Sequence, residues 1–336
     1  MAAGLPWSAF EGKTVLITGA TGMLPAYMAE ALLCLNENRT KQKTRVIGLA
    51  RNDKRITSRF SAYEDREDLQ FLVQDVAAPI EMEQDVDFII HAASPASPRH
   101  YVADPVGTIR ANVLATQNLL QLAREHGVEG FLFFSSSEVY GLVDAAHIPT
   151  SEDWYGFLDP TEIRSCYAES KRTGETLCAS WAHQFQVPAR IVRPFHTYGP
   201  GMRMDDGRVF ADFVRDIVQG RDLVLTSDGA ARRAFCYLAD AVVAFFTVLL
   251  TGRVAWPYNV GNAAAETSIL ELANRLVSLV PAKGLKVVRK PGSGPKCCLS
   301  SPVPRSCPDL SRILALGWKP TTGIEEGFLR TVRSFE

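Results

Sequence analysis

The sequence predicts an α/β fold in which a doubly wound parallel sheet carries a smaller α/β lobe. Residues 13–18 form a buried-strand pattern that turns through glycines into an apolar helix at 27–35. Further apolar strand patterns recur along the first part of the chain, with a helical pattern between two of them. The chain has 336 residues, of which 46% are hydrophobic, so it can bury one large core.

The other strands and helices are expected from local apolar patterns, taken in order. Strands are expected at residues 45–50, 71–76, 86–91, 131–134 and 186–193, and an amphipathic helix at 112–124. Beyond Met202 we expect a helix at 209–218, a strand-like segment at 234–237, a polar loop at 291–308 and a terminal helix near 323–335. Residues 1–194 are thus expected to form the main sheet domain, and 195–336 mainly the smaller lobe, with a strand near 257–261 returning to the sheet.

Bulk composition argues against several classes of function. The formal net charge is −1, so the chain lacks the electrostatic signature of a nucleic-acid-binding protein. There is no signal-peptide pattern and no apolar run long enough for a membrane span, so we expect a cytoplasmic protein without membrane contact. The seven cysteines follow no disulfide pattern, and the cluster Cys297, Cys298 and Cys307 has no histidine beside it, so no metal site is expected.

A glycine turn directly follows the first strand and joins it to the first helix at residues 19–22. Glycines at this point let backbone N–H groups and the helix N-terminus approach a pyrophosphate. The order of strand, glycine turn and helix therefore predicts a dinucleotide site in a Rossmann-type sheet. The expected cofactor contacts are Gly19, Thr21, Gly22, Met23 and Leu24.

A polar cluster follows the strand expected at residues 131–134. Ser136 and Ser137 stand at its end, and Tyr167 and Lys171 come later, four residues apart. On a helix these two side chains would share one face. An ammonium group lowers the pKa of a neighbouring phenol, so we expect Tyr167 to act as a general acid/base on a sugar or alcohol oxygen. A serine hydroxyl is placed to hydrogen-bond the same oxygen.

Several phrases of the sequence carry a specific resemblance. They are residues 91–98, 136–141, 165–172, 197–200, 206–209, 233–237, 259–262 and 308–310. Through them the chain resembles the extended short-chain dehydrogenases/reductases that act as nucleotide-sugar epimerases and dehydratases, and among these it is most similar to the UDP-glucuronate decarboxylases. The resemblance covers essentially the whole chain. It implies an enzyme with NAD as cofactor, a nucleotide-sugar as substrate and a homodimer as the assembly.

The resemblance also implies roles for residues outside the catalytic cluster. Cofactor contacts are implied at Arg51, Asp75, Val76, Ala92, Ala93, Ser94 and Asn112, in addition to Tyr167 and Lys171. Substrate contacts are implied at His196, Arg208, Val209 and Arg233. Among these, Arg233 resembles the arginine that grips the nucleotide diphosphate, a role that suits the guanidinium fork.

Three residues depart from the family pattern. Pro25 replaces the third glycine of the turn, but a first helical turn accepts proline, so we expect cofactor binding to survive. Arg51 stands where an acid would hold the adenosine ribose; NAD is favoured, and NADP is the alternative because arginine suits a 2′-phosphate. His196 stands where the family usually has asparagine, which leaves both its role and the exact sugar open.

The two residues after Ser136 indicate which reaction of the family is favoured. The sugar 4,6-dehydratases, which this region also resembles, carry an Asp–Glu pair there, whereas simple 4-epimerases generally lack the glutamate. Ser137 and Glu138 stand between these two patterns, as in the UDP-glucuronate decarboxylases that the chain resembles. The resemblance therefore implies decarboxylation of UDP-glucuronate through a 4-keto intermediate as the leading hypothesis. A 4-epimerase or 4-keto reductase is the close alternative, and a 4,6-dehydratase is a more distant one. A non-catalytic NAD(P)-binding protein is the alternative of another class, and the presence of Tyr167, Lys171 and Glu138 speaks against it.

Overall fold

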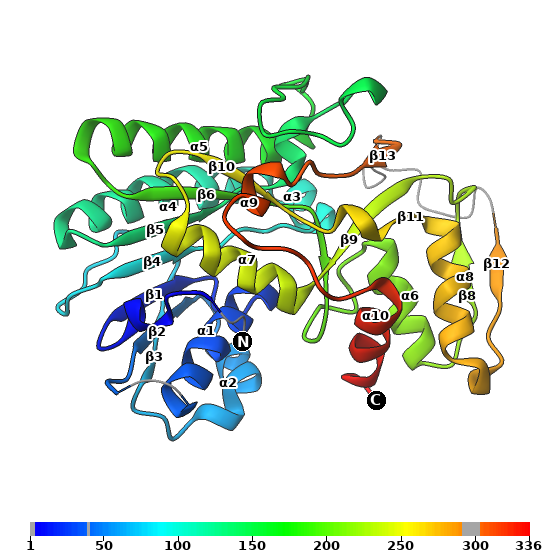
Figure 1. Ribbon diagram of the computed structural model, residues 1–336, viewed down its shortest axis with the longest axis horizontal. Helices are drawn as coiled ribbons and strands as arrows, with labels where there is room; N and C mark the ends of the chain where they lie inside the picture. Colours follow the sequence, from blue (N-terminus) through cyan, green and yellow to red (C-terminus); the bar gives the residue numbers. More distant parts are fainter. Residues whose placement is uncertain (1–3, 39–40, 291–302) are drawn as a thin grey trace.

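A seven-stranded sheet forms the larger part of the molecule (Figure 1). The computed structural model describes residues 4–38, 41–290 and 303–336. The strand order is β10-β6-β5-β4-β1-β2-β3, and all six pairings are parallel. The predicted doubly wound parallel sheet is therefore confirmed. The order reverses at β1, which lies between β2 and β4, and ligands of such sheets bind beyond the strand ends near this reversal.

The strands of this sheet lie close to the expected positions. They are β1 (Thr14–Thr18), β2 (Arg45–Ala50), β3 (Leu69–Val73), β4 (Phe88–His91), β5 (Gly130–Phe134), β6 (Ala189–Pro194) and β10 (Pro257–Val260). β3 ends before the predicted residue 76, because the Asp75 side chain accepts a bond from the Ala77 N–H and forms a turn. β6 begins after the predicted residue 186, because Gln186 has a left-handed φ of 59° that ends the preceding helix.

Helices cover both faces of the large sheet. One face carries α1 (Met23–Asn38) and α7 (Leu238–Thr251), whose apolar side chains share one buried cluster with β1 and β5. The other face carries α4 (Pro105–His126) and α5 (Ser165–Phe185), which form a second buried cluster with β4 and β5. α4 begins well before the predicted residue 112, because Pro105 occupies its first turn and Asp104 caps the Gly107 N–H.

The smaller lobe is built around β9 (Arg232–Tyr237). β9 pairs with β7 (His196–Tyr198) and β13 (Arg305–Ser306) in parallel and with β11 (Glu266–Ser268) in antiparallel orientation. Three helices pack here: α6 (Val209–Val218), at the predicted bounds, α8 (Ile269–Leu279) and α10 (Ile324–Arg333). A separate parallel pair joins β8 (Leu223–Leu225) to β12 (Val287–Arg289).

Three short helices and several 3₁₀ turns complete the described part of the chain. They are α2 (Asp53–Phe60), α3 (Pro98–Ala103) and α9 (Ser311–Leu314), with single 3₁₀ turns at η1 (Trp7–Phe10), η2 (Ser61–Tyr63), η3 (Ser137–Tyr140), η4 (Ala145–His147), η5 (Ala263–Ala265) and η6 (Pro281–Lys283). α7, β10 and α9 come late in the chain but pack on the large sheet. Most of the loop expected at 291–308 lies outside the described residues; its last residues include β13.

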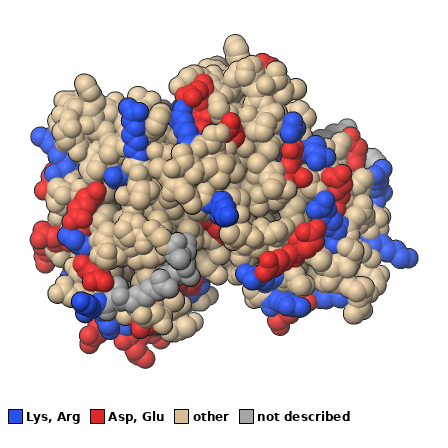
Figure 2. Space-filling model, viewed as in Figure 1, with Lys and Arg blue, Asp and Glu red and all other residues tan. Residues whose placement is uncertain are grey.

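Charge on the visible surface and the hydropathy of the helices were both compared with what a binding surface or a membrane span would require. On the face shown in Figure 2, basic and acidic side chains are interspersed, so this face has no extended area of one sign. None of the helices within the described ranges is long and apolar enough to cross a membrane.

Candidate active site

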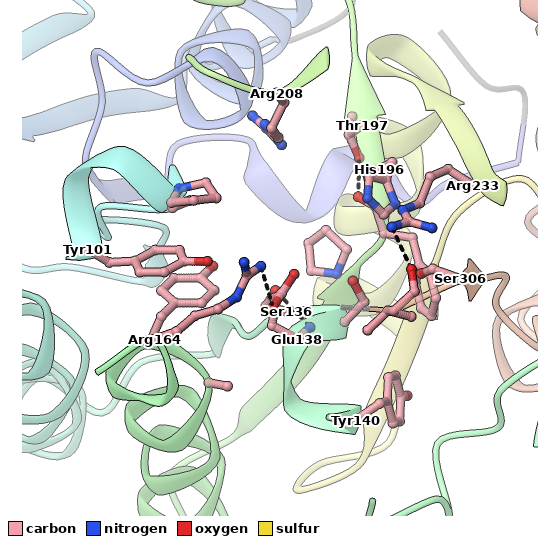
Figure 3. A pocket seen from close by; sticks show the side chains of 18 of the residues that line it. Tyr101, Ser136, Glu138, Tyr140, Arg164, His196, Thr197, Arg208, Arg233 and Ser306 are labelled. Carbon is pink, nitrogen blue, oxygen red and sulfur yellow. Dashed lines mark hydrogen bonds and ion pairs between the residues drawn. The ribbon is translucent and has the colours of Figure 1, made fainter. Parts of the chain in front are cut away.

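A cavity of about 1170 Å³ lies between the large sheet and the smaller lobe. Its walls come from the glycine turn, the end of β5 with η3, the first turns of α5, β7, the start of α6 and β9. Figure 3 shows side chains from these elements converging on the space between them. The cavity therefore lies where the strand order reverses, as expected for a doubly wound sheet.

α5 presents Tyr167 and Lys171 to the cavity from one face, because the two residues are four apart on the helix. Both side chains are buried: Tyr167 is 6% and Lys171 2% exposed. Nζ of Lys171 donates a 2.6 Å hydrogen bond to the carbonyl of Phe134, the last residue of β5. This bond ties the helix to the strand end that carries the serines, so the two predicted clusters do meet.

The protonation of these two groups is set mainly by burial. Burial raises the pKa of Tyr167 to about 12; a hydrogen bond with Ser136 lowers it, Glu138 raises it and Arg208 lowers it. Burial lowers the pKa of Lys171 to about 7. The expectation that Lys171 depresses the pKa of Tyr167 is wrong for this geometry. The ammonium bonds the Phe134 carbonyl and lies 5.8 Å from the centre of the phenol ring.

Two side chains fix the position of the phenol. Ser136 caps η3, where its Oγ accepts a 3.2 Å bond from the Glu138 N–H, and the same hydroxyl hydrogen-bonds Tyr167. Ser137 also lines the cavity. Tyr101 of α3 stacks on Tyr167 with ring centroids 5.0 Å apart and planes 12° apart. The sequence analysis missed Tyr101, because it belongs to a separate short helix and no spacing links it to Tyr167.

Glu138 lies opposite an arginine that the sequence analysis also missed. Nη2 of Arg164 lies 3.6 Å from Oε2 of Glu138, and both residues line the cavity (Figure 3). Arg164 directly precedes α5 and already has helical backbone angles. The sequence spacing could have indicated Arg164, because residues 167 and 171 follow it by three and seven positions and so share one helix face with it.

The glycine turn matches the expected dinucleotide cradle. Gly19 has a φ of +68°, and a Cβ there would lie 2.8 Å from Cα of Ala93, so only glycine fits. Pro25 lies in the first turn of α1, where proline is accepted, and does not interrupt the helix. The Ser94 hydroxyl is buried at the cavity without a hydrogen-bond partner among the described residues. The predicted contacts that line this end are Gly19, Gly22, Met23, Leu24, Ala92 and Ser94.

Other predicted cofactor residues lie outside the cavity wall; they are Thr21, Arg51, Asp75, Val76, Ala93 and Asn112. Asn112 is fully buried and donates to Ser170 Oγ at 2.8 Å, so it supports α5 from behind. Ala93 donates its N–H to Thr18 Oγ1 at 3.1 Å. Arg51 is exposed, with Nη1 4.0 Å from Oδ2 of Asp75.

The far end of the cavity is basic. Arg233 of β9 is 8% exposed, and its guanidinium donates to the carbonyls of Arg232 at 2.7 Å and Val303 at 2.8 Å. Burial lowers the pKa of Arg233. Arg208 precedes α6 and pairs with Asp206. Val209, the first residue of α6, lines the cavity beside it.

His196 lies on β7 at the same end. Burial, Arg233 and Arg208 lower its pKa to about 3, so the imidazole is neutral at physiological pH. Its Nδ1 is buried and has no hydrogen-bond partner among the described residues. A neutral ring with an unused nitrogen beside two arginines is suited to hydrogen-bond a ligand.

Metal-binding side chains do not gather in the described ranges, where no three His, Cys, Asp or Glu residues form a group that could hold an ion. Cys307 is buried and free. Cys297 and Cys298, the other members of the cysteine cluster noted in the sequence, lie outside the described residues.

Comparisons with known proteins agree with this geometry. The model of the NAD dependent epimerase/dehydratase family matches residues 15–261. UDP-glucuronic acid decarboxylase 1 of Xenopus tropicalis is 34% identical over 327 residues, covering 97% of this chain and 72% of that protein. UDP-glucuronic acid decarboxylase 6 of Arabidopsis thaliana is 33% identical over 315 residues, covering 93% and 86%.

Solved structures share the fold. UDP-glucuronic acid 4-epimerase from Bacillus cereus, in complex with UDP-glucuronic acid and NAD, superposes with a TM-score of 0.79 at 23% identity, covering 96% of this chain and 98% of that one. UDP-glucose 4-epimerase of Thermotoga maritima, with UDP-glucose, gives 0.81 at 23% identity, with 96% and 98% covered. The family is NAD-dependent, so the comparisons favour NAD over the NADP alternative raised by Arg51. With the cradle, the Tyr–Lys helix and the match over most of its length, this chain belongs to the NAD dependent epimerase/dehydratase family.

Proposed function

We propose that this protein decarboxylates UDP-glucuronate to a UDP-pentose by oxidising the sugar at C4 and reducing it again in the same cavity. The observation that carries the proposal is Glu138. In a chain 34% identical to UDP-glucuronic acid decarboxylases, this carboxylate lines the cavity that also holds Tyr167 and Ser136. The position before it is Ser137, a poor acid, where the sugar 4,6-dehydratase pattern has a second acid.

The residues of the dinucleotide end fit NAD. The Gly19–Gly22 turn and the start of α1 would hold the pyrophosphate, and the unpartnered Ser94 hydroxyl supplies a polar contact further along the cavity. When bound, NAD supplies a hydride acceptor for C4 and the hydride donor that restores it.

Tyr167 is the proposed general acid/base at the C4 oxygen. In its phenolate form Tyr167 would take the proton from the C4 hydroxyl as the ketone forms, and the resulting phenol would return it when the ketone is reduced. Ser136, which already hydrogen-bonds the phenol, would donate to the same sugar oxygen. Lys171 ties α5 to the end of β5 through the Phe134 carbonyl, and the stacked Tyr101 holds the phenol ring.

The carbon–carbon bond breaks once C4 is a ketone. The C6 carboxylate is then β to a carbonyl: the C5–C6 bond breaks, CO₂ leaves, and the electron pair forms an enolate on the C4 oxygen. A proton then adds to C5, and reduction of the ketone gives the pentose. Glu138 is the proposed general acid/base for the proton that is transferred to C5.

The nucleotide diphosphate is assigned to the basic end of the cavity. Arg233 and Arg208 supply positive charge there, and the neutral His196 supplies a hydrogen bond from its unused Nδ1. Val209 packs beside them. The substrate would thus span the cavity with its phosphates at β9 and its sugar beneath Tyr167.

Product analysis tests the proposal. NAD-loaded protein with UDP-glucuronate should release CO₂ and a UDP-pentose, identified by mass spectrometry and NMR. Glu138→Gln should be slower by about 10²- to 10⁴-fold, as for loss of a positioned acid/base, whereas Glu125→Gln on the exposed side of α4 should match wild type. Unchanged UDP-glucuronate contradicts the proposal. Its C4 epimer as the product would favour the 4-epimerase instead.

We further propose a cytoplasmic homodimer. α4 exposes Val106, Ile109 and Leu114, which are 67%, 44% and 43% accessible on a helix that covers one face of the sheet. An exposed apolar helix face favours pairing with a second copy. The cysteines of the described ranges are free, as suits a reducing compartment. Light scattering should give a dimer, and Ile109→Glu should shift it towards monomer; a wild-type monomer contradicts this assembly.

A further inference from the structure

Tyr101 brings a second phenol to the catalytic end of the cavity. It lies on α3, where its backbone N–H donates a 3.1 Å bond to the carbonyl of Ser97, and its side chain is almost fully buried. The ring lines the cavity and stacks on Tyr167 (Figure 3). The stack accounts for the ring of Tyr101, but it gives no function to the hydroxyl.

The hydroxyl of Tyr101 has no hydrogen-bond partner within residues 4–38, 41–290 and 303–336. The polar contacts of Tyr101 are made by its backbone, whose carbonyl accepts a 3.5 Å bond from Sγ of Cys166. Polar groups that are enclosed in a protein nearly always find a partner. Because the ring lines the cavity, we expect a bound ligand to supply the partner of this hydroxyl.

The protonation of Tyr101 decides what kind of ligand group suits it. Burial raises the pKa of its phenol above the ordinary 10, and Glu138 raises it further, whereas Arg164 lowers it. The phenol therefore keeps its proton at physiological pH and is a neutral donor. An ionised carboxylate only accepts hydrogen bonds, and bonds to it are stronger than those to a neutral oxygen.

Glu138 indicates which part of the sugar lies near this hydroxyl. It is the charged group with the largest effect on the pKa of Tyr101, and it also raises the pKa of Tyr167. In the proposed reaction, C4 lies at Tyr167 and C5 at Glu138. The C6 carboxylate is attached to C5 and would therefore lie beside Tyr101. A donor at this point offsets the repulsion between the substrate carboxylate and Glu138.

We propose that the Tyr101 hydroxyl donates a hydrogen bond to the C6 carboxylate of the substrate and makes the cavity selective for a nucleotide-linked uronic acid. This rests on the proposed function for the identity of the sugar. The ring of Tyr101 positions the catalytic phenol, whereas its hydroxyl contacts the substrate. The bond is made to the group that leaves as CO₂, so its loss should raise KM more than it lowers kcat.

The test compares ligands with and without the carboxylate. NAD-loaded Tyr167→Phe protein, which binds without turnover, is titrated calorimetrically with UDP-glucuronate and with UDP-xylose. Adding Tyr101→Phe should weaken UDP-glucuronate by about 10- to 100-fold, the range for loss of a hydrogen bond to a charged group, and UDP-xylose by less than about threefold. Tyr155→Phe, the same change at an exposed side chain, should alter neither. Equal weakening of both ligands, or of neither, overturns the assignment.

Kinetics of two variants separate the hydroxyl from the ring. Tyr101→Phe keeps the ring that stacks on Tyr167, whereas Tyr101→Leu removes it. With UDP-glucuronate, Tyr101→Phe should raise KM by about tenfold or more and keep kcat within about threefold, and Tyr101→Leu should also lower kcat. A lower kcat with unchanged KM in Tyr101→Phe contradicts the hydroxyl contact, and equal kcat in the two variants contradicts the role of the ring.

Failure of this inference can be told apart from failure of the proposed function. If the wild-type protein turns over UDP-glucuronate but Tyr101→Phe binds both ligands alike, only the assignment of Tyr101 is wrong. If the wild-type protein does not turn over UDP-glucuronate, the proposed function is wrong.

Discussion

The two ends of the cavity are built in different ways. At the catalytic end, Tyr167, Lys171 and Ser136 come from one helix and the strand end that it contacts, joined by the Lys171–Phe134 bond. At the basic end, His196, Arg208 and Arg233 come from three segments of the smaller lobe. Local helix geometry positions the proposed proton-transfer group at the first end. At the second end, long-range folding brings positively charged side chains together. Variants at the two ends should therefore fail differently, the first in turnover and the second in binding.

The largest effect is expected at the catalytic end. Tyr167→Phe removes only the phenolic oxygen, so turnover should fall by about 10²- to 10⁴-fold while binding of NAD and UDP-glucuronate stays within about threefold. Tyr155→Phe, at a side chain that is 81% exposed, provides the control and should match wild type. Steady-state kinetics and titration calorimetry measure both. An active Tyr167→Phe protein would show that Tyr167 is not the general acid/base.

A binding defect is expected at the basic end. Arg233→Lys keeps a charge but loses the fork, so affinity for UDP should fall by about tenfold, and Arg233→Met should lose about 10- to 100-fold. Arg232→Met is the neighbouring control, because Arg232 is 42% exposed and pairs with Glu266 and Glu271. Calorimetry with UDP measures the affinities. If Arg233→Met keeps UDP affinity but loses kcat, the assigned division between the ends is wrong.

The ends should also respond to pH in separate windows. Burial lowers the pKa of Lys171 to about 7 from its ordinary 10.5, so between these values the unfolded chain binds more protons. Stability due to this group therefore rises with pH from about 7 to 10.5. Wild type should gain on the order of 2 °C in Tm from pH 7 to 9 relative to Lys171→Met. An equal change in both proteins would show that Lys171 is not held with a lowered pKa.

His196 should act in the acidic window with a smaller effect. Its folded pKa of about 3 lies below the ordinary 6.5, so stability from the neutral ring is lost as pH falls through this range. Thermal melts at pH 7 and 5 should therefore show a larger loss for wild type than for His196→Asn. Because the ring stays neutral above pH 5, the acidic limb of the activity profile should not move in His196→Asn. A shifted limb would show that His196 titrates during turnover.

The difference between local and long-range construction of the two cavity ends explains which residues could be predicted from the sequence. The glycine turn, the Tyr–Lys spacing and the serines at a strand end are short-range patterns on regular elements, so the fold and the catalytic cluster followed from them. The placement of Arg233 beside His196 depends on the pairing of β7 with β9, which no local pattern encodes, and only the family resemblance indicated it. Tyr101 was missed for a similar reason, because its stack on Tyr167 joins two separate helices.

One sequence expectation failed because burial outweighed the effect expected of a neighbouring charge. Lys171 was expected to lower the pKa of Tyr167, but its bond to a backbone carbonyl directs it elsewhere, and desolvation raises the pKa of the phenol. Asn112, expected at the cofactor, donates to Ser170 Oγ and lies outside the cavity wall. Helix spacing could have indicated Arg164, since it completes the face shared by Tyr167 and Lys171.

The central claim is that C4 is oxidised and reduced again in one cavity while the carboxylate at C6 is lost. Turnover of UDP-glucuronate carrying deuterium at C4, with a separate reaction in D₂O, tests it most directly by NMR of the product. The account predicts a UDP-pentose that keeps the C4 label and, in D₂O, gains one solvent deuterium at C5. A product that has lost the C4 label to solvent, or a six-carbon product with its carboxylate intact, would contradict it.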